Sequence, residues 1–304
     1  MMKKISIIGA GYVGSSIAYS LMLTDAARQI ALIDINETAA DAEVADIRPG
    51  FSGISLTKVY RGSYADTADS DIVVVTAGVN RKPGESRMDL IGKNAVIAKD
   101  ISAKLKENKA RGIVIVVSNP VDVITQIIAR ELNETTGRVF GTGCILDSAR
   151  FRCVLGDFLG VEETVVRAFV AGEHGPGQIL LWSSVTVENQ PLTEWLTAQG
   201  KTLSETDKQT IAETVAGLGA RIIAGKQRTH YGIAGCVAYI VNEMKEGRRT
   251  LLSLTFPAAN ENISVSRPCL LTETGVTETA SDSLSFEEAE QIGQTMTRLK
   301  QIAL

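Results

Sequence analysis

The chain has 304 residues, of which 44% are hydrophobic and 22% charged, as is usual for a globular protein of one large or two medium domains. Its formal net charge is −4 and no basic block stands out, so we expect neither nucleic acid nor a membrane surface as a partner. No stretch approaches the roughly 18 apolar residues that span a bilayer, and two histidines with four scattered cysteines predict no metal site, which together favour a cytoplasmic protein.

The first half of the chain repeats a unit in which an apolar run precedes Gly or Pro and then an amphipathic stretch. The apolar runs lie at residues 4–11, 29–35, 71–78, 112–120 and 138–143. Their continuous apolarity is typical of parallel strands buried on both faces. Helical spacing follows at residues 13–24 and 88–110, the second with an apolar stripe of Ile91, Ala95, Ala98, Ile101 and Leu105. Strands alternating with helices predict an α/β fold, a Rossmann doubly wound parallel sheet over residues 1–142, with ligands at the carboxyl ends of its strands.

A glycine pattern follows the first predicted strand. Gly9, Gly11 and Gly14 form GxGxxG at the start of a helix, where backbone amides can approach a pyrophosphate. Asp34 ends the next strand 20 residues beyond Gly14 (34 − 14 = 20), in position to accept hydrogen bonds from an adenosine ribose. Residues Ile35–Glu37 contain no lysine or arginine for a 2′-phosphate, which Asp34 would repel. The predicted cofactor is therefore NAD rather than NADP.

Two arginines share one short loop after the third long apolar run. The loop reads "RKPGESR" and places Arg81 and Arg87 on either side of Pro83 and Gly84. Arginine is costly to order, so a loop that holds two of them is typical of an anion-binding segment. We expect this loop to meet a negatively charged ligand.

The second half has a different pattern and predicts an α+β catalytic domain over residues 143–304. Strands are expected at residues 164–172 and 180–192, the latter with a turn at Glu188–Asn189, before a long helix at 204–226. Ser285 and Glu288 form a capping-box pair that predicts the start of the last helix.

Three residues of this half are candidates for catalysis. His174 lies in "GEHG" at the end of a predicted strand, and Asp147 and Arg150 lie three residues apart in "LDSAR". A carboxylate that accepts a hydrogen bond from a histidine fixes the ring and stabilises its protonated form. A nearby arginine can hold a substrate carboxylate with two parallel hydrogen bonds. The structural alternative is a strand-end histidine beside an intrahelical ion pair.

Five motifs in sequence order resemble the NAD-dependent lactate/malate dehydrogenase family: "GAGYVG", "TAGVNRKPGESR", "VSNPVDV", "LDSARFR" and "GEHG". The resemblance implies reversible hydride transfer between NAD and a small 2-oxo or 2-hydroxy acid. It makes His174 the proton carrier, Asp147 its orienting partner, Arg150 the ligand of the substrate carboxylate and Arg87 the loop residue that polarises the ketone. The resemblance also implies that Asn119 lies near the nicotinamide and the substrate carbonyl, with further cofactor contacts at Tyr12, Val13, Tyr64, Gly78 and Ser118.

The substrate is less clearly indicated. Arg81 aligns with the family's usual discriminator, which is typically glutamine in lactate enzymes and arginine in malate enzymes, where it pairs with the second carboxylate of oxaloacetate. The "GESR" and "GEHG" motifs resemble lactate enzymes instead, and Thr229 stands where those enzymes place a pocket threonine. We predict L-lactate dehydrogenase activity, which interconverts pyruvate and lactate. Malate dehydrogenase is the alternative because of Arg81, followed by another 2-hydroxy acid and by a catalytically inactive NAD-binding protein.

The resemblance carries further expectations and two departures. Arg152 and Arg167 match the basic positions of a fructose-bisphosphate site in activated bacterial lactate enzymes, although they could equally be surface residues that favour solubility. Pro176 replaces the family's usual aspartate, and "SVSRPC" at 264–269 replaces a glycine-containing segment, so both bear on the edge of the second domain. Family resemblance also implies a homodimer or homotetramer, with a role in glycolysis and carboxylic acid metabolism.

Overall fold

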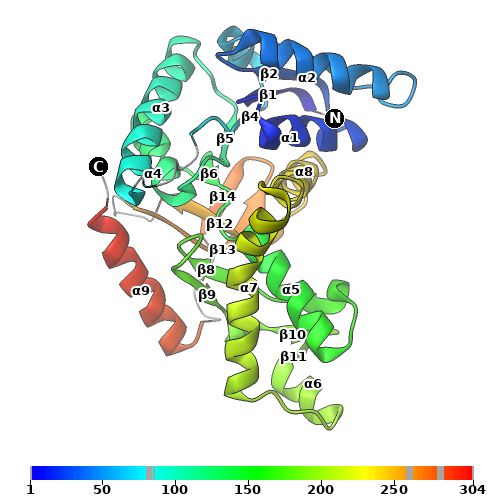
Figure 1. The fold of residues 1–304 in the computed structure, drawn as a ribbon, viewed down its shortest axis with the longest axis vertical. Helices are drawn as coiled ribbons and strands as arrows, with labels where there is room; N and C mark the ends of the chain where they lie inside the picture. The colour runs from blue at the N-terminus through cyan, green and yellow to red at the C-terminus, as the bar shows by residue number, and fades with distance from the viewer. Residues whose placement is uncertain (1, 80–83, 85, 258–262, 279–283, 303–304) are drawn as a thin grey trace.

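The computed structural model describes residues 2–79, 84, 86–257, 263–278 and 284–302. The N-terminal half of the chain forms one end of an elongated molecule, and the segment from α5 to α7 forms the other end (Figure 1). Of the helices in the described ranges, none is both long enough and apolar enough to cross a membrane. Within the same ranges, no cluster of three or more His, Cys, Asp or Glu side chains is arranged to hold a metal ion.

A parallel sheet forms the centre of the N-terminal half. Its strand order is β3-β2-β1-β4-β5-β6, and every neighbouring pair is parallel. The strands are β1 (Met2–Ile8), β2 (Ala27–Ile33), β3 (Lys58–Arg61), β4 (Ile72–Val75), β5 (Ile113–Val116) and β6 (Val139–Gly141). The chain reverses its winding direction between β1 and β4, so a ligand cleft is expected where the carboxyl ends of these two strands diverge.

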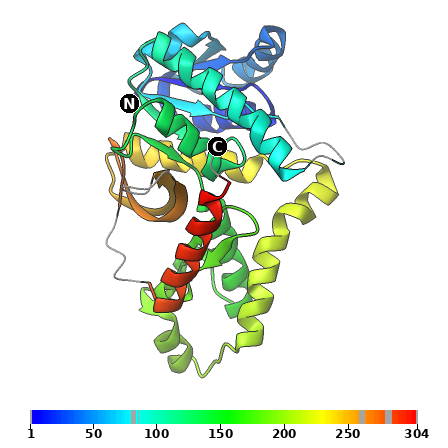
Figure 2. The ribbon, with the colours of Figure 1, turned by 90° about the vertical axis from the view of Figure 1, so that its left-hand side faces the viewer.

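Helices cover both faces of this sheet because alternate strand side chains point to opposite sides. Ile5, Ile7 and Val74 face α1 (Tyr12–Leu23), α2 (Glu37–Gly50) and α8 (Tyr231–Lys245). Val73, Val75 and their neighbours face α3 (Arg87–Glu107) and α4 (Val121–Glu131). Since α8 belongs to the second half of the sequence, the two halves share one core. Figure 2 shows this helix crossing the middle of the molecule.

The second half continues the same sheet with antiparallel strands. Gly141 of β6 pairs with Thr255 of β12 (Thr250–Pro257), and the order then runs β12-β13-β8-β9. These strands are β13 (Ser264–Thr272), β8 (Val170–Gly172) and β9 (Gln178–Leu180), with β14 (Gly275–Glu278) also paired to β13. A small separate sheet contains β7 (Val166–Arg167), β10 (Thr186–Val187) and β11 (Gln190–Pro191). The helices of this half are α5 (Ile145–Leu159), α6 (Leu192–Ala198), α7 (Glu205–Lys226) and α9 (Phe286–Lys300).

The capping box predicted for the last helix is confirmed. The backbone N–H of Glu288 donates to Ser285 Oγ at 3.2 Å, and Glu288 accepts the backbone N–H of Ser285 at 2.9 Å. The Glu288 carboxylate also accepts the backbone N–H of Ser183 at 3.0 Å. The cap therefore both starts α9 and fixes it to the chain after β9.

Three local expectations differ from the structure. The strand expected at residues 164–172 is divided into β7 and β8, which belong to different sheets. Residues 180–192 do not form one hairpin, because Trp182–Ser184 form a 3₁₀ turn between β9 and β10. Trp182 packs edge-on against Phe151 with ring centroids 4.8 Å apart, and this tertiary contact prevails over local strand preference. The predicted turn at Glu188–Asn189 is present, with positive φ at both residues. Segment 264–269 lies in β13 between β12 and β8, so it is inside the sheet and not at the domain edge.

Candidate active site

The structure gives each glycine of the GxGxxG turn a different constraint. Gly9 has φ +109° and a Cβ there would lie 2.7 Å from the backbone nitrogen of Ala77. A Cβ on Gly14 would lie 1.8 Å from the Gly9 carbonyl oxygen, so this position packs the helix against the turn. A Cβ added to Gly11 would meet no atom within 4 Å beyond its chain neighbours and its own helix, so the space beside this residue is open to a ligand at the N-terminus of α1. These are the three geometric demands of a dinucleotide turn.

A cavity of about 560 Å³ opens beside the turn, at the carboxyl ends of β1 and β4. Asp34 lies in its wall, where its carboxylate accepts the backbone N–H groups of Ala10 at 2.7 Å and Asn36 at 2.8 Å. Of the residues predicted from the sequence, the lining contains Gly9, Gly11, Asp34, Tyr64 and Gly78. It also contains residues that sequence reasoning missed, namely Thr76, Ala77 and Val79 after β4 and Val96, Ile97, Asp100 and Ile101 on α3. The first three lie in the "TAGVNRKPGESR" motif, which gave a signal for them, whereas the four residues of α3 carry no motif and reach the cavity only because α3 packs against the sheet.

Tyr64 is half-buried at the edge of this cavity. Burial, followed by the charges of Asp100 and Asp34, raises the pKa of its hydroxyl to about 12, so the group stays neutral. The Lys104 ammonium lies 5.1 Å from the centre of its ring. Tyr64 can therefore offer an aromatic face and a neutral hydroxyl.

The carboxyl end of β5 is fixed by a network that includes a residue the sequence did not reveal. Ser118 donates its hydroxyl hydrogen to the Ala77 carbonyl at 2.7 Å and so connects the ends of β4 and β5. Asn94 is buried on α3, donates to the carbonyl of Asn119 at 2.7 Å and accepts from the N–H of Val79 at 2.8 Å. The side chain of Asn119 stays exposed. A polar residue within the apolar stripe of predicted helix 88–110 was the available signal for Asn94.

The corner between α7 and α8 lies against the glycine turn. Tyr12, the first residue of α1, is 60% exposed, whereas Val13 packs against the core. The Arg228 guanidinium lies over the Tyr12 ring, 4.0 Å from its centre. Thr229 follows it and is half-buried. The tertiary structure thus places the predicted pocket threonine in a segment that reaches the cofactor turn.

The Asp147–His174 pair predicted from the sequence is brought together by the fold. Asp147 lies in the first turn of α5 and is buried, while His174 follows β8. His174 Nδ1 lies 2.6 Å from Asp147 Oδ2. An ionised carboxylate can only accept, so Nδ1 carries the hydrogen. The His174 side chain remains 28% exposed, and no described residue hydrogen-bonds its Nε2, so that nitrogen can meet a ligand.

The pair is electrostatically biased toward the charged states. Burial would lower the pKa of His174, but its hydrogen bond to Asp147 and the Asp147 charge outweigh this and raise the pKa above the ordinary value. Burial would likewise raise the pKa of Asp147, yet the contacts with His174 and Arg150 lower it. A histidine in this setting can hold and release a proton near neutral pH.

Arg150 completes the cluster from the same face of α5. Its Nη1 donates to Asp147 Oδ1 at 3.0 Å, and its side chain is 14% exposed. No other described side chain hydrogen-bonds the guanidinium. Gly219 of α7 lies beside it, since a Cβ there would be 3.9 Å from the guanidinium nitrogens. Asp147 orients Arg150 while leaving most of its donors available for an anion.

The two loop arginines cannot be placed in this cluster. Arg81 lies outside the described residues. Arg87 is the first residue of α3, after the capping residue Ser86, and its side chain is outside what the structure describes. Their roles stay predictions from the sequence.

The residues predicted for an allosteric anion lie on neighbouring elements. Arg152 of α5 donates to the Ala168 carbonyl at 3.4 Å, one residue after Arg167. Arg167 is exposed and its guanidinium lies 5.5 Å from the centre of the Phe169 ring. The site stays a prediction, as does any effect of Pro176, which lies in the turn between β8 and β9.

Comparisons with other proteins agree with this architecture. The family model "lactate/malate dehydrogenase, NAD binding domain" matches residues 3–141, and "lactate/malate dehydrogenase, alpha/beta C-terminal domain" matches residues 144–303. The L-lactate dehydrogenase of Geotalea daltonii is 36% identical over 296 residues, which cover 95% of each chain. That of Deinococcus radiodurans is 35% identical over 293 residues, covering 96% of this chain and 95% of the relative.

Solved structures give the same result. The minor L-lactate dehydrogenase from Enterococcus mundtii in its ligands-bound form has a TM-score of 0.94 at 32% identity, covering 99% of this chain and 97% of that chain. Its ligands-unbound form has a TM-score of 0.89 at 31% identity, with 99% and 96% covered. The predicted fold class, a Rossmann domain followed by an α+β domain, is confirmed. The chain belongs to the lactate/malate dehydrogenase family of oxidoreductases, which act on small 2-oxo and 2-hydroxy acids, and its cofactor is NAD.

Proposed function

We propose that this chain is an L-lactate dehydrogenase that interconverts pyruvate and lactate with NAD. The observation that carries the proposal is the cluster of Asp147, His174 and Arg150, in which one buried carboxylate orients both a proton carrier and a cation. The named relatives above, which are L-lactate dehydrogenases, support the choice of substrate. We further propose a division at residues 1–142 and 143–304 into a cofactor domain and a catalytic domain.

The residues beside the glycine turn fit the cofactor. The open backbone at Gly11 and the N-terminus of α1 would hold its pyrophosphate, and Asp34 would accept hydrogen bonds from its adenosine ribose. Tyr64 and Gly78 would line the same cavity, and Asn119 and Ser118 would lie nearer the nicotinamide. When bound, NADH supplies the hydride.

His174 supplies the proton in pyruvate reduction. Its Nε2–H donates to the ketone oxygen as the carbonyl carbon accepts the hydride, and the ring becomes neutral. Asp147 keeps the Nδ1 hydrogen throughout, so it fixes the ring and stabilises the protonated state without taking a proton. In lactate oxidation the neutral Nε2 accepts the hydroxyl proton.

Two arginines complete the proposed mechanism. Arg150 binds the carboxylate common to every 2-oxo acid, which orients the ketone toward His174. Arg87 polarises the ketone oxygen as charge develops on it. Thr229 lines the far side of the substrate pocket. Arg81 contacts the end of the substrate that distinguishes pyruvate from oxaloacetate.

The assay that tests this function is NADH oxidation with pyruvate, oxaloacetate and bulkier 2-oxo acids, each with and without fructose bisphosphate. We expect pyruvate to give the highest kcat/KM. Replacing Arg81 with glutamine should then lower the oxaloacetate-to-pyruvate ratio of kcat/KM by about tenfold, because an ion pair with the second carboxylate would be lost. If oxaloacetate is the better substrate, the alternative malate dehydrogenase function is correct. An unchanged ratio in Arg81→Gln would show that Arg81 does not sense the substrate tail.

Cofactor preference should depend on Asp34. We expect Asp34→Ser to raise the ratio of kcat/KM for NADPH over NADH by about tenfold or more, because the carboxylate that repels a 2′-phosphate is gone. Steady-state rates with each cofactor measure this ratio. Glu37→Gln is the matched control, since Glu37 is exposed and pairs with Arg61. Equal ratios in all three proteins would contradict the assignment of Asp34.

The quaternary structure and location belong to the same proposal. We propose a cytoplasmic homodimer or homotetramer, as the family resemblance implies. Activation by fructose bisphosphate through Arg152 and Arg167 would appear in the assay above as a fall in KM for pyruvate. NAD binding with no turnover of any 2-oxo acid would instead support an inactive binding protein.

A further inference from the structure

A second buried carboxylate contacts the backbone of His174. Asp122 Oδ2 accepts the backbone N–H of His174 at 2.9 Å, and Asp122 is only 3% exposed. Asp122 lies on α4, two residues after Pro120 and three after Asn119. One carboxylate therefore connects the segment that carries Asn119 to the proton carrier of the other half.

The surroundings of Asp122 supply hydrogen-bond donors. Its Oδ1 accepts the hydroxyl hydrogen of Thr255 on β12, and the Ser266 hydroxyl on β13 lies 3.4 Å from the same oxygen. Ser266 in turn accepts the backbone N–H of Cys144, the residue that precedes α5, at 3.1 Å. The network thus joins the start of α4, the His174 loop and the start of the helix that bears Asp147.

This network depends on the segment that departs from the family pattern. Ser266 belongs to "SVSRPC", the segment in which the family resemblance implies a glycine-containing stretch instead. The site is closely packed, because a Cβ on Gly143 would lie 2.3 Å from Ser266 Oγ and 2.6 Å from Thr255 Oγ1. The strand therefore contributes a hydroxyl directly to the support of His174.

The donors around Asp122 partly offset the cost of burying a carboxylate. Burial raises the pKa of this carboxyl above its ordinary value, and the hydrogen bonds from Thr255 and the His174 N–H oppose the rise without cancelling it. Asp122 lies in the first turn of α4, at the positive end of the helix dipole. The helix start, the amide and the hydroxyl groups all stabilise the ionised form against the effect of burial.

We propose that Asp122 is a positioning residue for the reaction, a buried anion that fixes the His174 backbone and stabilises the protonated imidazole together with Asp147. The proposal rests on the proposed role of His174 as proton carrier. Asp122 adds to the rise in the pKa of His174, after the larger effect of Asp147. Asp122 thereby adjusts the balance between pyruvate reduction, which needs the protonated ring, and lactate oxidation, which needs the neutral one.

The charged groups around His174 are few enough to separate by experiment. From α5 come Asp147, which favours the protonated ring, and Arg150, which disfavours it. From α4 comes Asp122. On the chain neighbouring His174, Glu173 is buried and paired with Arg298 of α9 at 2.7 Å. The residues that β12 and β13 contribute to the network are hydroxyls without charge.

The first test measures protonation directly. The chain has only two histidines, so a sample labelled with ¹⁵N-histidine gives two sets of imidazole signals, which His230→Gln assigns. In the wild type we expect His174 to titrate above the ordinary range and His230 below it, the latter because of burial and the Lys226 and Arg228 charges. In Asp122→Asn the midpoint of His174 should fall while that of His230 stays unchanged. This measurement does not require turnover, so it remains informative if the proposed function fails.

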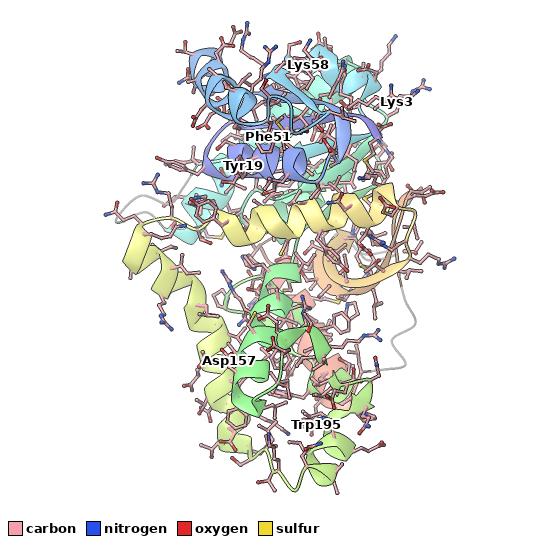
Figure 3. All side chains as sticks on the ribbon, turned by 90° about the vertical axis from the view of Figure 1, so that its right-hand side faces the viewer. Lys3, Tyr19, Phe51, Lys58, Asp157 and Trp195 are labelled. Atoms are coloured by element: carbon pink, nitrogen blue, oxygen red, sulfur yellow. The ribbon has the colours of Figure 1, made fainter. Side chains whose placement is uncertain are left out.

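The second test uses the two directions of the reaction. At a fixed pH above the His174 midpoint, Asp122→Asn should slow pyruvate reduction about threefold or more. Below the midpoint, the same variant should accelerate lactate oxidation, whereas a merely structural defect would slow both directions. Asp157→Asn is the matched control, because Asp157 is an exposed carboxylate near the C-terminal end of α5, in the half of the molecule that lies away from the N-terminal sheet (Figure 3). Asp122→Ser removes the same charge and replaces Asp122→Asn if the latter does not fold.

The result that overturns the proposal is a folded Asp122 variant in which the His174 midpoint is unchanged. It is equally overturned if reduction and oxidation decline together without a change in their pH profiles. If neither variant folds, Asp122 serves the fold and not the reaction, and the proposal is wrong. If the wild type turns over neither pyruvate nor lactate, the proposed function fails, and the titration alone decides the role of Asp122.

Discussion

Replacing His174 with asparagine should lower kcat for pyruvate reduction by about a thousandfold or more, within the range that a positioned general acid contributes. Asparagine cannot donate and regain a proton at neutral pH, whereas Nε2 of His174 can. The binding of NADH should change little, because the cofactor cavity lies beside Gly9, Gly11 and Asp34 and does not include His174. Stopped-flow rates and NADH fluorescence titration measure the two quantities separately.

A variant that keeps its rate within tenfold of the wild type would contradict the assignment of His174. Loss of NADH binding together with turnover would indicate general damage to the fold. Asp147→Asn provides a comparison within the same pair. Because Asp147 is the larger favourable influence on the protonated ring, its loss should lower the kinetic pKa for pyruvate reduction as well as the rate.

The pH dependence of the wild type follows from the raised pKa of His174. Pyruvate reduction requires the protonated ring, so its rate should be highest at low pH and fall as pH rises through that raised pKa. Lactate oxidation requires the neutral ring and should show the opposite profile, rising through the same pH range. Coincident midpoints in the two directions would identify one titrating group.

Replacing Arg150 with glutamine should lower kcat/KM for pyruvate on the order of a thousandfold, since two charge-assisted hydrogen bonds to the substrate carboxylate are lost. Most of the loss should appear in KM. The charge of Arg150 lowers the pKa of His174, so in Arg150→Gln the His174 imidazole should titrate at higher pH than in the wild type. The rise in the His174 midpoint distinguishes Arg150→Gln from Asp147→Asn, in which the His174 midpoint should fall.

Steady-state kinetics across pH measure both features of Arg150→Gln. Arg152→Gln is the matched control, because Arg152 lies on the same helix but donates to the Ala168 carbonyl and not to Asp147. In the absence of fructose bisphosphate it should behave like the wild type. If Arg150→Gln retains the wild-type KM, the substrate carboxylate is bound elsewhere.

The sequence predicted those elements whose residue pattern within a single segment is enough to indicate a strand or a helix. The continuous apolar runs predicted the parallel strands, because a strand covered on both faces has no polar side. The spacing of Ile91, Ala95, Ala98, Ile101 and Leu105 predicted the buried face of α3, and all five are buried. Helices α2, α4 and α8 were not among the predicted elements. Eight of the eleven residues of α4 are buried, because this helix packs against α3 and against β6, β12 and β13.

The residues of the candidate site also fall into those that the sequence indicated and those that only the structure revealed. Motifs named Gly9, Asp34, Asp147 and His174, because each is required by local turn or helix geometry or by distinctive chemistry. Asn94 and Asp122 escaped notice, since a single polar residue in an apolar segment acquires meaning only from what surrounds it. The role of Asn94 becomes visible only when the ends of β4 and β5 lie beside it. That of Asp122 becomes visible only when β12, β13 and the His174 loop pack against α4.

The sequence by itself determined the alternation of strands and helices in the first half, the dinucleotide turn, the preference for NAD and the residue types of the catalytic cluster. The tertiary structure alone decided that β6 continues into β12, which places α4 beside the His174 loop. The physical reason is the range of the interactions. Periodicity, capping and turns depend on residues a few positions apart, whereas Asp122 meets His174 across 52 positions and Ser266 across 144. Such contacts form only when the whole sheet has assembled, so no local pattern records them.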